Sequence, residues 1–502
     1  MIRSLLIANR GEIAVRIIRA AREMGIRAVA VYSEVDRSSP HVLEADEAHL
    51  IGPAPSAESY LRVDRLLEVA RSAGVDAIHP GYGFLAERAA FARAVEQAGF
   101  AFVGPHAATI AAMGDKTEAR RRMEAAGVPI VPGLVESVED VEEALSAAEQ
   151  IGYPVLLKAA AGGGGKGMRI VQRPDELPRA FDAARREALA AFADGAIYLE
   201  RYLQRPRHIE IQVLGDHHGN VVHLGERECS IQRRHQKLVE EAPSPILTPE
   251  QRARMGQAAV RAARAVDYAG AGTVEFLYQD GTFYFLEMNT RLQVEHPVTE
   301  LVTGLDLVSW QLRIASGEEL DFTQDDVTRT GHAIECRITS EDPLHGFLPS
   351  TGVVTHLELP GGPGVRWDGG IARGFHVSLH YDPLLAKLIV HAPTRAAAIG
   401  RMTRALDDLV IGGVETSASF HRRVMDEADF RAGRLSIRYV EEHPELTDGE
   451  QPEEEARAAA VLAAILEEER RQRHQVPRSA EGRAAGGGMT AWQRAARPWR
   501  EG

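Results

Sequence analysis

The first hundred residues alternate apolar runs with helical stretches, and this alternation constrains the fold more than any other feature of the sequence. Apolar runs of a length suited to buried strands lie at 5–8, 28–32 and 76–79. The helical stretch at 12–24 ends at Gly25, as a helix with a glycine C-cap does. Parallel strands need helical crossovers of this kind, so residues 4–104 predict a small parallel α/β unit. No Gly-x-Gly-x-x-Gly motif follows the first strand, so the sequence does not support dinucleotide binding there.

Two further units are expected after this one. A strand at 154–160 leads into a glycine-rich run, and a helix and a strand at 197–202 complete the unit 127–203. Thr248-Pro249-Glu250-Gln251 is a capping box with proline at the first helical position, so a helix begins there. From about 204 to 446 the pattern is mostly antiparallel, with strands expected at 208–214, 221–226, 273–278, 282–289, 331–339, 353–359 and 384–391.

Composition excludes several classes of protein. A chain of 502 residues predicts several packed subdomains, and its net charge of −14 argues against a sequence-independent nucleic-acid binder. No run of about 18 apolar residues occurs, so no membrane span is expected, and the first residues are too quickly polar for a signal peptide. Only two cysteines are present, Cys229 and Cys336, which argues against a disulfide scaffold and fits the reducing cytoplasm.

Lysine is scarce. Of the 58 lysine and arginine residues only five are lysine, namely Lys116, Lys158, Lys166, Lys237 and Lys387. GC-rich coding with lysines left at random is one explanation. Lysine, however, is a compact point charge and arginine a broad fork, so a lysine retained in an arginine-rich chain favours a position that needs the ammonium group. Four of the five lie in segments that carry other chemical signals, and Lys387 does not.

Five of the six residues at 162–167 are glycine, directly after a predicted strand. Such a run lets backbone N–H groups approach an anion closely, and Lys158 and Lys166 favour phosphate as that anion. The run is not a Walker A loop, because no Gly-Lys-Ser/Thr sequence is present. A flexible surface loop is the alternative interpretation.

Acidic and amide residues are unusual inside strands, yet Glu275, Glu287 and Asn289 lie in one predicted hairpin. Glu287 and Asn289 share a face by the two-residue period of a strand. A two-residue turn at 280–281 would pair Glu275 with Leu286, whereas a three-residue turn would place it opposite Glu287. Opposed carboxylates repel, so the second arrangement predicts a cation between them, and Mg²⁺ beside nucleotide phosphates fits. Solvated acids on an exposed strand face are the alternative.

The same strand is expected to continue through Arg291, Gln293 and Glu295, where cation, amide and carboxylate recur every second residue. These groups would converge on a small anion beside the metal, with Arg291 as a fork and Glu295 as candidate general base. A polar strand edge with a fortuitous alternation is the alternative.

Two more segments carry chemistry-bearing residues. The segment 225–237 is dense in hydrogen-bond donors and ends on Lys237, with a solvated basic run as the alternative. Cys229 within it is expected to be a small buried residue and not a nucleophile. Tyr82 lies between two glycines at the end of a predicted strand, where α/β sheets bind ligands, so it suits a planar ligand. A purely structural turn is the alternative interpretation of this segment.

Together these segments resemble the biotin carboxylase family, the ATP-grasp component of biotin-dependent carboxylases. The resemblance covers roughly residues 1–446 and rests most on 225–237 and on Glu-Met-Asn-Thr-Arg-Leu-Gln-Val-Glu-His at 287–296. Ile-Ala-Asn-Arg-Gly-Glu-Ile-Ala near the start and the segments 79–85, 113–116 and 162–167 support it. Two positions depart mildly from the family pattern: Arg201, where lysine is frequent, and Lys166, where arginine is common.

The resemblance implies an ATP-grasp fold, α/β and α+β in class. It implies an N-terminal parallel α/β (pre-ATP-grasp) domain at 1–115 and an ATP-grasp domain at 116–330 with a mobile lid subdomain at about 127–203. A mostly antiparallel C-terminal domain at 331–446 and a charged helix with a flexible tail at 447–502 would follow.

The resemblance also implies roles for single residues. ATP would be held by Lys116, Lys158, Gly162, Gly163, Gly164, Gly165, Glu200, Leu203, His208, Gln232, His235, Glu275 and Glu287. Mg²⁺, or Mn²⁺ in its place, would be bound by Glu275, Glu287 and Asn289. Bicarbonate would lie among Lys237, Arg291, Gln293, Val294 and Glu295, and biotin against Tyr82 and Arg337. Lys237, Arg291, Glu295 and Arg337 would be the catalytic residues.

The implied activity is ATP- and bicarbonate-dependent carboxylation of biotin on a carrier protein, through carboxyphosphate. This is the first half-reaction of an acyl-CoA carboxylase, such as that of fatty acid biosynthesis, or of pyruvate carboxylase. No Met-Lys pair typical of biotinylated carriers occurs, so carrier and carboxyltransferase are expected as separate chains, and the family suggests a homodimer. The rival hypotheses are another ATP-grasp carboxylate–amine ligase and a non-catalytic nucleotide-binding subunit.

The last fifty residues have a different character. An acidic, alanine-rich helix is expected at 453–473, and a glycine-rich linker at 484–488 follows. Tryptophan and arginine are favoured anchors of protein interfaces, so the tail is a candidate tether to the carboxyltransferase or the carrier protein. The alternative interpretations are that the tail docks onto its own chain or is disordered. The proposed anchors are Trp492, Arg494, Arg497 and Trp499.

Overall fold

The computed structural model describes residues 1–133, 137–138, 140–159, 168–192, 195–448, 461 and 464–465. Residues Met1–Thr447 form one compact unit, and Asp448–Gly502 are a separate one. The glycine-rich run at 162–167 and the proposed tail anchors lie outside the described residues, as does nearly all of the charged helix expected at 453–473. Among the residues that are described, no helix combines the length and apolar character needed to cross a membrane.

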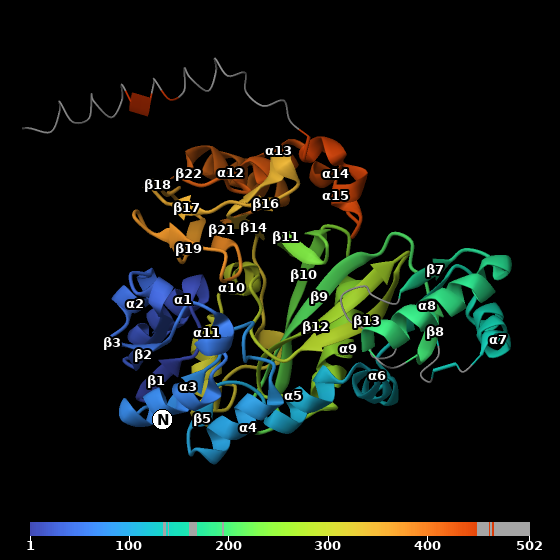
Figure 1. Cartoon of the computed structure of the whole chain (residues 1–502), viewed down its shortest axis with the longest axis horizontal. Helices are drawn as coiled ribbons and strands as arrows, with labels where there is room; N and C mark the ends of the chain where they lie inside the picture. Colours follow the sequence, from blue (N-terminus) through green and yellow to red (C-terminus); the bar gives the residue numbers. More distant parts are fainter. Residues whose placement is uncertain are drawn as a thin grey trace, which may run out of the picture. The chain divides into compact units, whose positions relative to one another are not determined.

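The N-terminal residues form the predicted parallel α/β unit. Its five strands are all parallel and lie in the order β3-β2-β1-β4-β5. They are β1 (Ser4–Ile7), β2 (Arg27–Ser33), β3 (Glu47–Gly52), β4 (Ala77–His79) and β5 (Ala101–Phe102). The helices are α1 (Gly11–Glu23), α2 (Pro40–Glu44), α3 (Val63–Ser72), α4 (Ala89–Gln97) and α5 (Ala107–Gly114), and α6 (Lys116–Ala125) follows this unit. In Figure 1 this unit is the blue region, and apolar side chains of α1 such as Ile13 and Ile17 are fully buried in it.

A small three-stranded sheet follows, with the order β7-β6-β8 and antiparallel pairing. Its strands are β6 (Val155–Ala159), β7 (Arg169–Val171) and β8 (Ile197–Arg201), and its helices are α7 (Val141–Ile151) and α8 (Leu177–Phe192). Val155, Leu157 and Phe181 form a core of its own. This subdomain lies to one side of the rest in Figure 1, as expected of a lid with a separate core.

A single eight-stranded antiparallel sheet runs through the centre of the molecule, in the order β13-β12-β9-β10-β11-β14-β21-β19 (Figure 1). Its strands are β9 (Arg207–Gly215), β10 (Val221–Arg233), β11 (Gln236–Ala242), β12 (Gly270–Gln279), β13 (Thr282–Asn289), β14 (His332–Thr339), β19 (Val365–Gly369) and β21 (Leu384–Ala392). The predicted antiparallel character is therefore confirmed. The sheet continues across residue 330, so strands on both sides of that expected boundary share one hydrogen-bonded surface.

Helices cover this sheet and shorter strands complete the unit. The capping box at Thr248 is confirmed, since its side chain and that of Gln251 each accept from the other's backbone N–H, and it begins α9 (Pro249–Arg264). The other helices are α10 (His296–Thr303), α11 (Leu307–Ala315), α12 (Arg395–Asp408), α13 (Ala418–Asp426), α14 (Ala428–Arg431) and α15 (Tyr439–Glu442). The short strands are β15 (Glu341–Asp342), β16 (Leu348–Pro349), β17 (Gly352–Val353), β18 (His356–Glu358), β20 (His376–Val377) and β22 (Val410–Gly412).

One expected strand is divided in two. The sequence predicted a single strand at 353–359, but the chain changes partners inside it: Val354 N–H donates to Phe375 and Thr355 N–H donates to Gly412. The two halves, β17 and β18, therefore pair with β20 and β22 respectively.

Candidate active site

The acidic hairpin sets the register of the site. Asp280 and Gly281 form a two-residue turn and both have positive φ (51° and 81°), as a type I′ hairpin turn requires. That turn alone would pair Glu275 with Leu286, but a register shift beyond Phe276 leaves Leu286 unpaired. Glu275 consequently lies directly opposite Glu287. The opposed carboxylates are confirmed, whereas the three-residue turn expected to produce them is wrong: a bulge produces them instead.

The donor set of this hairpin fits a divalent cation with oxygen ligands. Within the described part of the chain the Glu287 carboxylate has no hydrogen-bond or ion-pair partner, and its side chain is exposed. Desolvation by its surroundings and the facing Glu275 carboxylate raise the pKa of Glu287, so a cation between them would relieve a real repulsion. Asn289 pairs with Thr273 on the same hairpin, and its amide group donates to Glu275 at 2.9 Å. Two carboxylates and an amide oxygen are ligands that Mg²⁺ prefers.

The strand expected to run to His296 stops at Asn289. Residues 290–295 form an irregular loop, and Glu295 is the N-cap residue of α10, whose first turn contains Pro297. Proline has no N–H to offer to a strand ladder but suits the first turn of a helix, so the chain leaves the sheet here. The predicted alternation along a pleat is therefore wrong. The loop nevertheless brings the expected side chains together.

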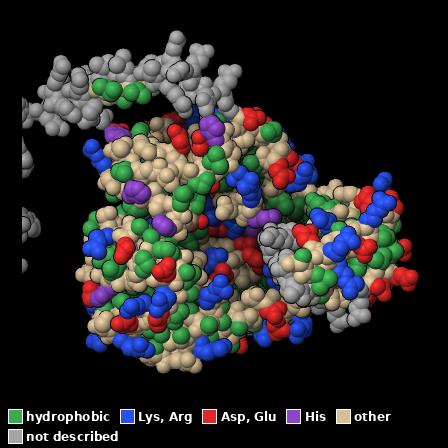
Figure 2. All heavy atoms as spheres, in the orientation of Figure 1, with side chains coloured by type: hydrophobic (Ala, Val, Ile, Leu, Met, Phe, Trp, Pro, Cys, Tyr) green, Lys and Arg blue, Asp and Glu red, His purple; other side chains and the backbone are tan. Residues whose placement is uncertain are grey.

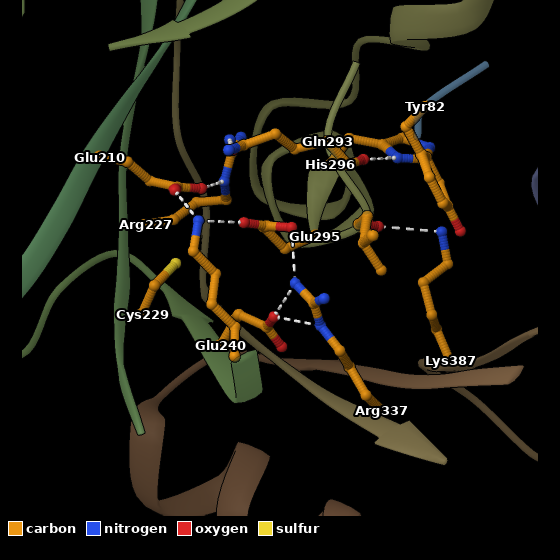
Figure 3. Close-up of polar contacts among 12 residues, drawn as sticks. Tyr82, Glu210, Arg227, Cys229, Glu240, Gln293, Glu295, His296, Arg337 and Lys387 are labelled. Carbon is orange, nitrogen blue, oxygen red and sulfur yellow. Dashed lines mark hydrogen bonds and ion pairs between the residues drawn. The ribbon is translucent and has the colours of Figure 1, made fainter. Parts of the chain in front are cut away.

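Lys237 is the centre of this convergence, and Figure 3 labels Glu210 and Glu295, two of the carboxylates that it contacts. Its Nζ donates to Glu210 at 2.6 Å, to Glu275 at 2.9 Å and to Glu295 at 2.6 Å, so three carboxylates surround one ammonium group. Although burial opposes it, these carboxylates raise the pKa of Lys237 well above its ordinary value. His208, Glu210 and Glu275 lie close enough together to hold a metal ion, but the ammonium group already supplies the cation there.

Arg227 orients the amide group next to this cluster. It is fully buried, and its five N–H donors all have acceptors: Glu210, Gln212, Thr299, Thr273 and Gln293. Because Oε1 of Gln293 accepts from Arg227 at 2.9 Å, its Nε2 is turned to Glu275, 2.7 Å away. The alternative of a solvated basic run at 225–237 is therefore wrong for Arg227.

Glu295 lies between two cations. One oxygen accepts from Lys237, and the other accepts from Arg337 at 2.8 Å. Although burial opposes it, Lys237, Arg337 and Arg227 hold the pKa of Glu295 well below its ordinary range, so it is a carboxylate. Arg337 is itself held by Glu240, which accepts from its Nε at 2.6 Å. The basic groups and the candidate base thus form one connected network.

Arg291 and Val294 complete the expected anion site. Arg291 donates to Asn289 at 3.0 Å and forms an ion pair with Glu87 of the N-terminal unit at 3.0 Å. The carbonyl oxygen of Val294 accepts from Lys387, whereas its N–H has no hydrogen-bond partner among the described residues. A guanidinium group and this backbone N–H therefore lie in the same loop as Glu295, which Lys237 contacts.

Tyr82 is fixed on the other side of the network. The side chain of Asn9 donates to the carbonyl groups of Pro80 at 2.8 Å and Tyr82 at 2.7 Å, and a Cβ at Gly81 would lie 2.8 Å from the amide nitrogen of Asn9. The Tyr82 hydroxyl donates to Glu12. Burial and the Glu12 carboxylate raise the pKa of Tyr82 well above its ordinary value, and the positive charge of Arg337 opposes this rise. Tyr82 and Arg337, the two residues expected at one ligand, thus lie near each other (Figure 3).

The residues expected at a nucleotide divide between the lid and the large sheet. Lys158 of β6 forms an ion pair with Glu200 of β8, and Arg120 of α6 lies 3.5 Å from the other carboxylate oxygen of Glu200. Leu203 follows β8 and is half-buried. On the large sheet His208 pairs with Glu275 at 3.0 Å and Gln232 contacts His208 at 3.5 Å.

Two more of these residues are exposed near the same region. His235 is in the tight turn between β10 and β11, with φ of 65°. Lys116 begins α6, and its charge acts on Glu287. Figure 2 shows that the face of the molecule is hollowed in its centre, with basic and acidic side chains around the hollow.

Cys229 is not a nucleophile. It is fully buried, and burial together with the neighbouring carboxylate of Glu210 raises the pKa of its thiol well above the ordinary value. Cys336 is also a buried free thiol. The expectation of a small buried residue is confirmed.

Sequence reasoning gave no role to several residues that hold this network together. Their partners are far away in the chain: Arg227 contacts Thr299 across 72 residues, and Lys387 contacts Val294 across 93. The scarcity of lysine was the one signal that could have found Lys387. The residues missed are Glu12, Glu210, Arg227, Glu240 and Lys387.

Family models match three consecutive parts of the chain. The biotin carboxylase N-terminal domain matches residues 1–110, and the biotin carboxylase C-terminal domain matches residues 335–442. Between them, the ATP-binding domain of the carbamoyl-phosphate synthase L chain matches residues 115–323.

Three named relatives match over most of their length. Biotin carboxylase of Nostoc sp. is 54% identical over 439 residues, which cover 87% of this chain and 98% of that protein. Biotin carboxylase 1 of Bacillus subtilis is 54% identical over 443 residues, 88% of this chain and 98% of that protein. A pyruvate carboxylase subunit of Methanothermobacter thermautotrophicus is 55% identical over 451 residues, 90% of this chain and 92% of that protein.

A solved structure is equally similar. The biotin carboxylase domain dimer of Hydrogenobacter thermophilus 2-oxoglutarate carboxylase, in complex with MgADP, ADP and bicarbonate, has a TM-score of 0.83 and 51% identity. The match covers 90% of this chain and 100% of that one.

Proposed function

The chain belongs to the biotin carboxylase family, and we propose that the network around Lys237 uses ATP and bicarbonate to carboxylate biotin on a separate carrier protein. One observation carries the assignment of residues: a carboxylate, Glu295, is fixed between the cations Lys237 and Arg337, next to a hairpin with opposed carboxylates. Activation of bicarbonate needs a base, cationic groups and a metal site in close proximity, and this arrangement supplies all three.

Bicarbonate binds among Lys237, Arg291, Gln293 and the free N–H of Val294. As the anion enters, Lys237 and Arg337 turn from Glu295 toward it, so the pKa of Glu295 rises from its depressed value. Glu295 then accepts the bicarbonate proton, a contribution on the order of 10²–10⁴ in rate for general-base catalysis. Lys237 and Arg337 therefore keep Glu295 ionised in the free enzyme, and they make it a stronger base when they turn toward the bound substrate.

Glu275, Glu287 and Asn289 would hold Mg²⁺. When bound, the ion neutralises the charge on the transferring phosphoryl group. The chain itself contributes Lys116 beside Glu287 and Lys158 on the lid, both of which would bind phosphate oxygens. Glu200 and Leu203 lie where β8 ends and would recognise the adenine.

Attack of a bicarbonate oxygen on the γ-phosphate of ATP releases ADP and gives carboxyphosphate, which is labile in water. A lid with its own core can close over the site as a body and exclude water. Carboxyphosphate then releases CO₂ beside biotin, and the liberated phosphate accepts the ureido proton. Arg337 stabilises the resulting enolate-like oxygen, with Tyr82 against the ring, and the deprotonated ureido nitrogen then attacks CO₂ to give carboxybiotin.

Several finer assignments belong to the same proposal. We divide the chain at 1–115, 116–330, 331–446 and 447–502, in line with the family-model matches. The carrier and carboxyltransferase are separate chains, because relatives are named as subunits of pyruvate and 2-oxoglutarate carboxylases. A homodimer is supported by the dimer of the 2-oxoglutarate carboxylase domain, and a cytoplasmic location by two free thiols.

Kinetics with small substrates tests the assignment. The purified chain should hydrolyse ATP slowly with Mg²⁺ and bicarbonate, and faster when free biotin is added. Glu295→Gln keeps the shape of the base but removes its proton-accepting charge, so it should lose this bicarbonate-dependent activity. Retention of parental turnover in Glu295→Gln would assign the base to another group.

A further inference from the structure

Lys387, the one lysine that the sequence left without a role, is fully buried beside the site. It lies on β21 directly opposite Arg337 of β14, so both side chains project from the same face of the sheet. Its Nζ donates to the carbonyl oxygen of Val294 at 2.9 Å and lies 3.1 Å from Oε2 of Glu12. A buried ammonium group is tolerated only when it is paired and hydrogen-bonded, and these two contacts provide both.

Glu12 is the counter-charge of this lysine. The nearest other carboxylate, that of Asp368, is 3.9 Å from Nζ. It is bound by both sides of the Arg366 fork, at 2.8 and 2.7 Å, so its charge is already neutralised. Glu12 is nearly inaccessible to solvent, and its other oxygen accepts from the Tyr82 hydroxyl. The Lys387–Glu12 pair therefore contacts the anion loop at one end and the proposed biotin residue at the other.

The pair joins three parts of the chain. Glu12 is in the first turn of α1, Val294 belongs to the loop before α10, and Lys387 lies in the C-terminal region. The approach of these parts is close: a Cβ at Gly370 would lie 2.6 Å from the backbone nitrogen of Glu12. These buried and direct contacts link the three parts at the site itself, in addition to the ion pairs of Glu300 with Arg16 and Arg366.

The contact with Val294 has a specific geometric consequence. The carbonyl of Val294 and the N–H of Glu295 belong to one planar peptide group, so a hydrogen bond to the carbonyl fixes the orientation of both. This group immediately precedes the Cα atom from which the Glu295 side chain projects.

We propose that Lys387 and Glu12 are positioning residues for carboxylation: Lys387 orients the peptide group that carries Glu295, and Glu12 orients the Tyr82 hydroxyl. One buried ion pair thus fixes the bicarbonate and biotin sites relative to each other. The inference rests on the proposed function and extends it to two residues outside the substrate contacts. The position of Lys387 therefore needs a compact ammonium group, as was inferred from the scarcity of lysine for the other four positions.

Three variants separate positioning from a merely structural role: Lys387→Met, Glu12→Gln and the double variant. Each single variant leaves a buried group of the pair without its partner and should lose stability, whereas the double variant should regain part of it. Turnover should not follow stability, because the Val294 carbonyl stays untethered in the double variant. We expect kcat with bicarbonate and free biotin to fall roughly tenfold or more in Lys387→Met and in the double variant. The KM for ATP should remain within about twofold of the parent.

Glu241→Gln is the matched control. Glu241 is a buried carboxylate paired with His332 at 2.6 Å and Arg395 at 2.7 Å, and its loss should reduce stability without changing kcat. Recovery of turnover together with stability in the double variant, or parental kcat in Lys387→Met, would overturn the inference. If Lys387→Met does not fold, Glu12→Gln and the double variant carry the same comparison. A parent without bicarbonate-dependent ATP hydrolysis would instead overturn the proposed function, and this inference with it.

Discussion

Replacing Lys237 by arginine keeps the charge of the site but changes its shape. Three N–H groups on one nitrogen now reach Glu210, Glu275 and Glu295 at 2.6 to 2.9 Å. A planar guanidinium group spreads its donors over three nitrogens and cannot direct them at the same three carboxylates from one point. A hydrogen bond to a charged group contributes about 1.5–3 kcal/mol, so misplacing the donor that Lys237 turns toward bicarbonate corresponds to roughly a 10- to 100-fold loss in the transition state.

We therefore expect Lys237→Arg to lower kcat/KM for bicarbonate by at least about tenfold, or about 1.4 kcal/mol. The assay is ATP hydrolysis at varied bicarbonate with saturating Mg²⁺, ATP and free biotin. Arg395→Lys, a basic-for-basic exchange in the ion pair with Glu241, should leave kcat/KM unchanged. A Lys237→Arg enzyme with parental kcat/KM for bicarbonate would refute the argument from point charge and would make the scarcity of lysine a coincidence.

Three further predictions concern the metal, pH and the tail. Glu275→Gln and Glu287→Gln should each raise the Mg²⁺ concentration needed for half-maximal activity without unfolding the chain, and a parental Mg²⁺ titration in either would contradict the metal assignment. Burial raises the pKa of Glu335 well above its ordinary 4.5, so the folded state holds a proton that the unfolded state releases. The stability of the parent should consequently fall relative to Glu335→Gln as pH rises above about 4.5 in urea titrations, and parallel curves would mean that Glu335 is ionised when buried. Truncation after Asp448 should keep free-biotin activity but weaken co-purification with partner subunits; unchanged co-purification would refute the tether.

Local signals predicted the framework of the fold well. The strand–helix alternation gave the parallel unit, and the capping box at Thr248 gave the start of α9, because both are determined by residues within one turn or one pleat of each other. The pairing of Glu275 with Glu287 was foreseen for the wrong reason. After a two-residue turn, the bulge at Leu286 brings Glu275 opposite Glu287. A bulge adds one residue to one strand, and the alternation of apolar and polar residues does not reveal where that residue is added.

Long-range contacts determined what the sequence could not predict. Arg227 looked like part of a solvated basic run, because nothing within the segment reveals the acceptors on four other elements that use its five donors. The loop 290–295 brings Arg291 and Glu295 to the site by leaving the strand, and the pleat pattern concealed that departure. The lysine scarcity was informative because chemistry, not position in the chain, selects a compact ammonium group.

The central claim is that the chain activates bicarbonate with ATP for transfer to biotin. The most direct test is the rate of ATP hydrolysis by the purified chain as bicarbonate and free biotin are added in turn, with Mg²⁺ present. We predict slow hydrolysis that requires bicarbonate and accelerates with biotin, with radiolabelled bicarbonate incorporated into biotin. Turnover that needs neither bicarbonate nor biotin, and is supported instead by an amine or amino acid, would contradict the account and favour another ATP-grasp ligase.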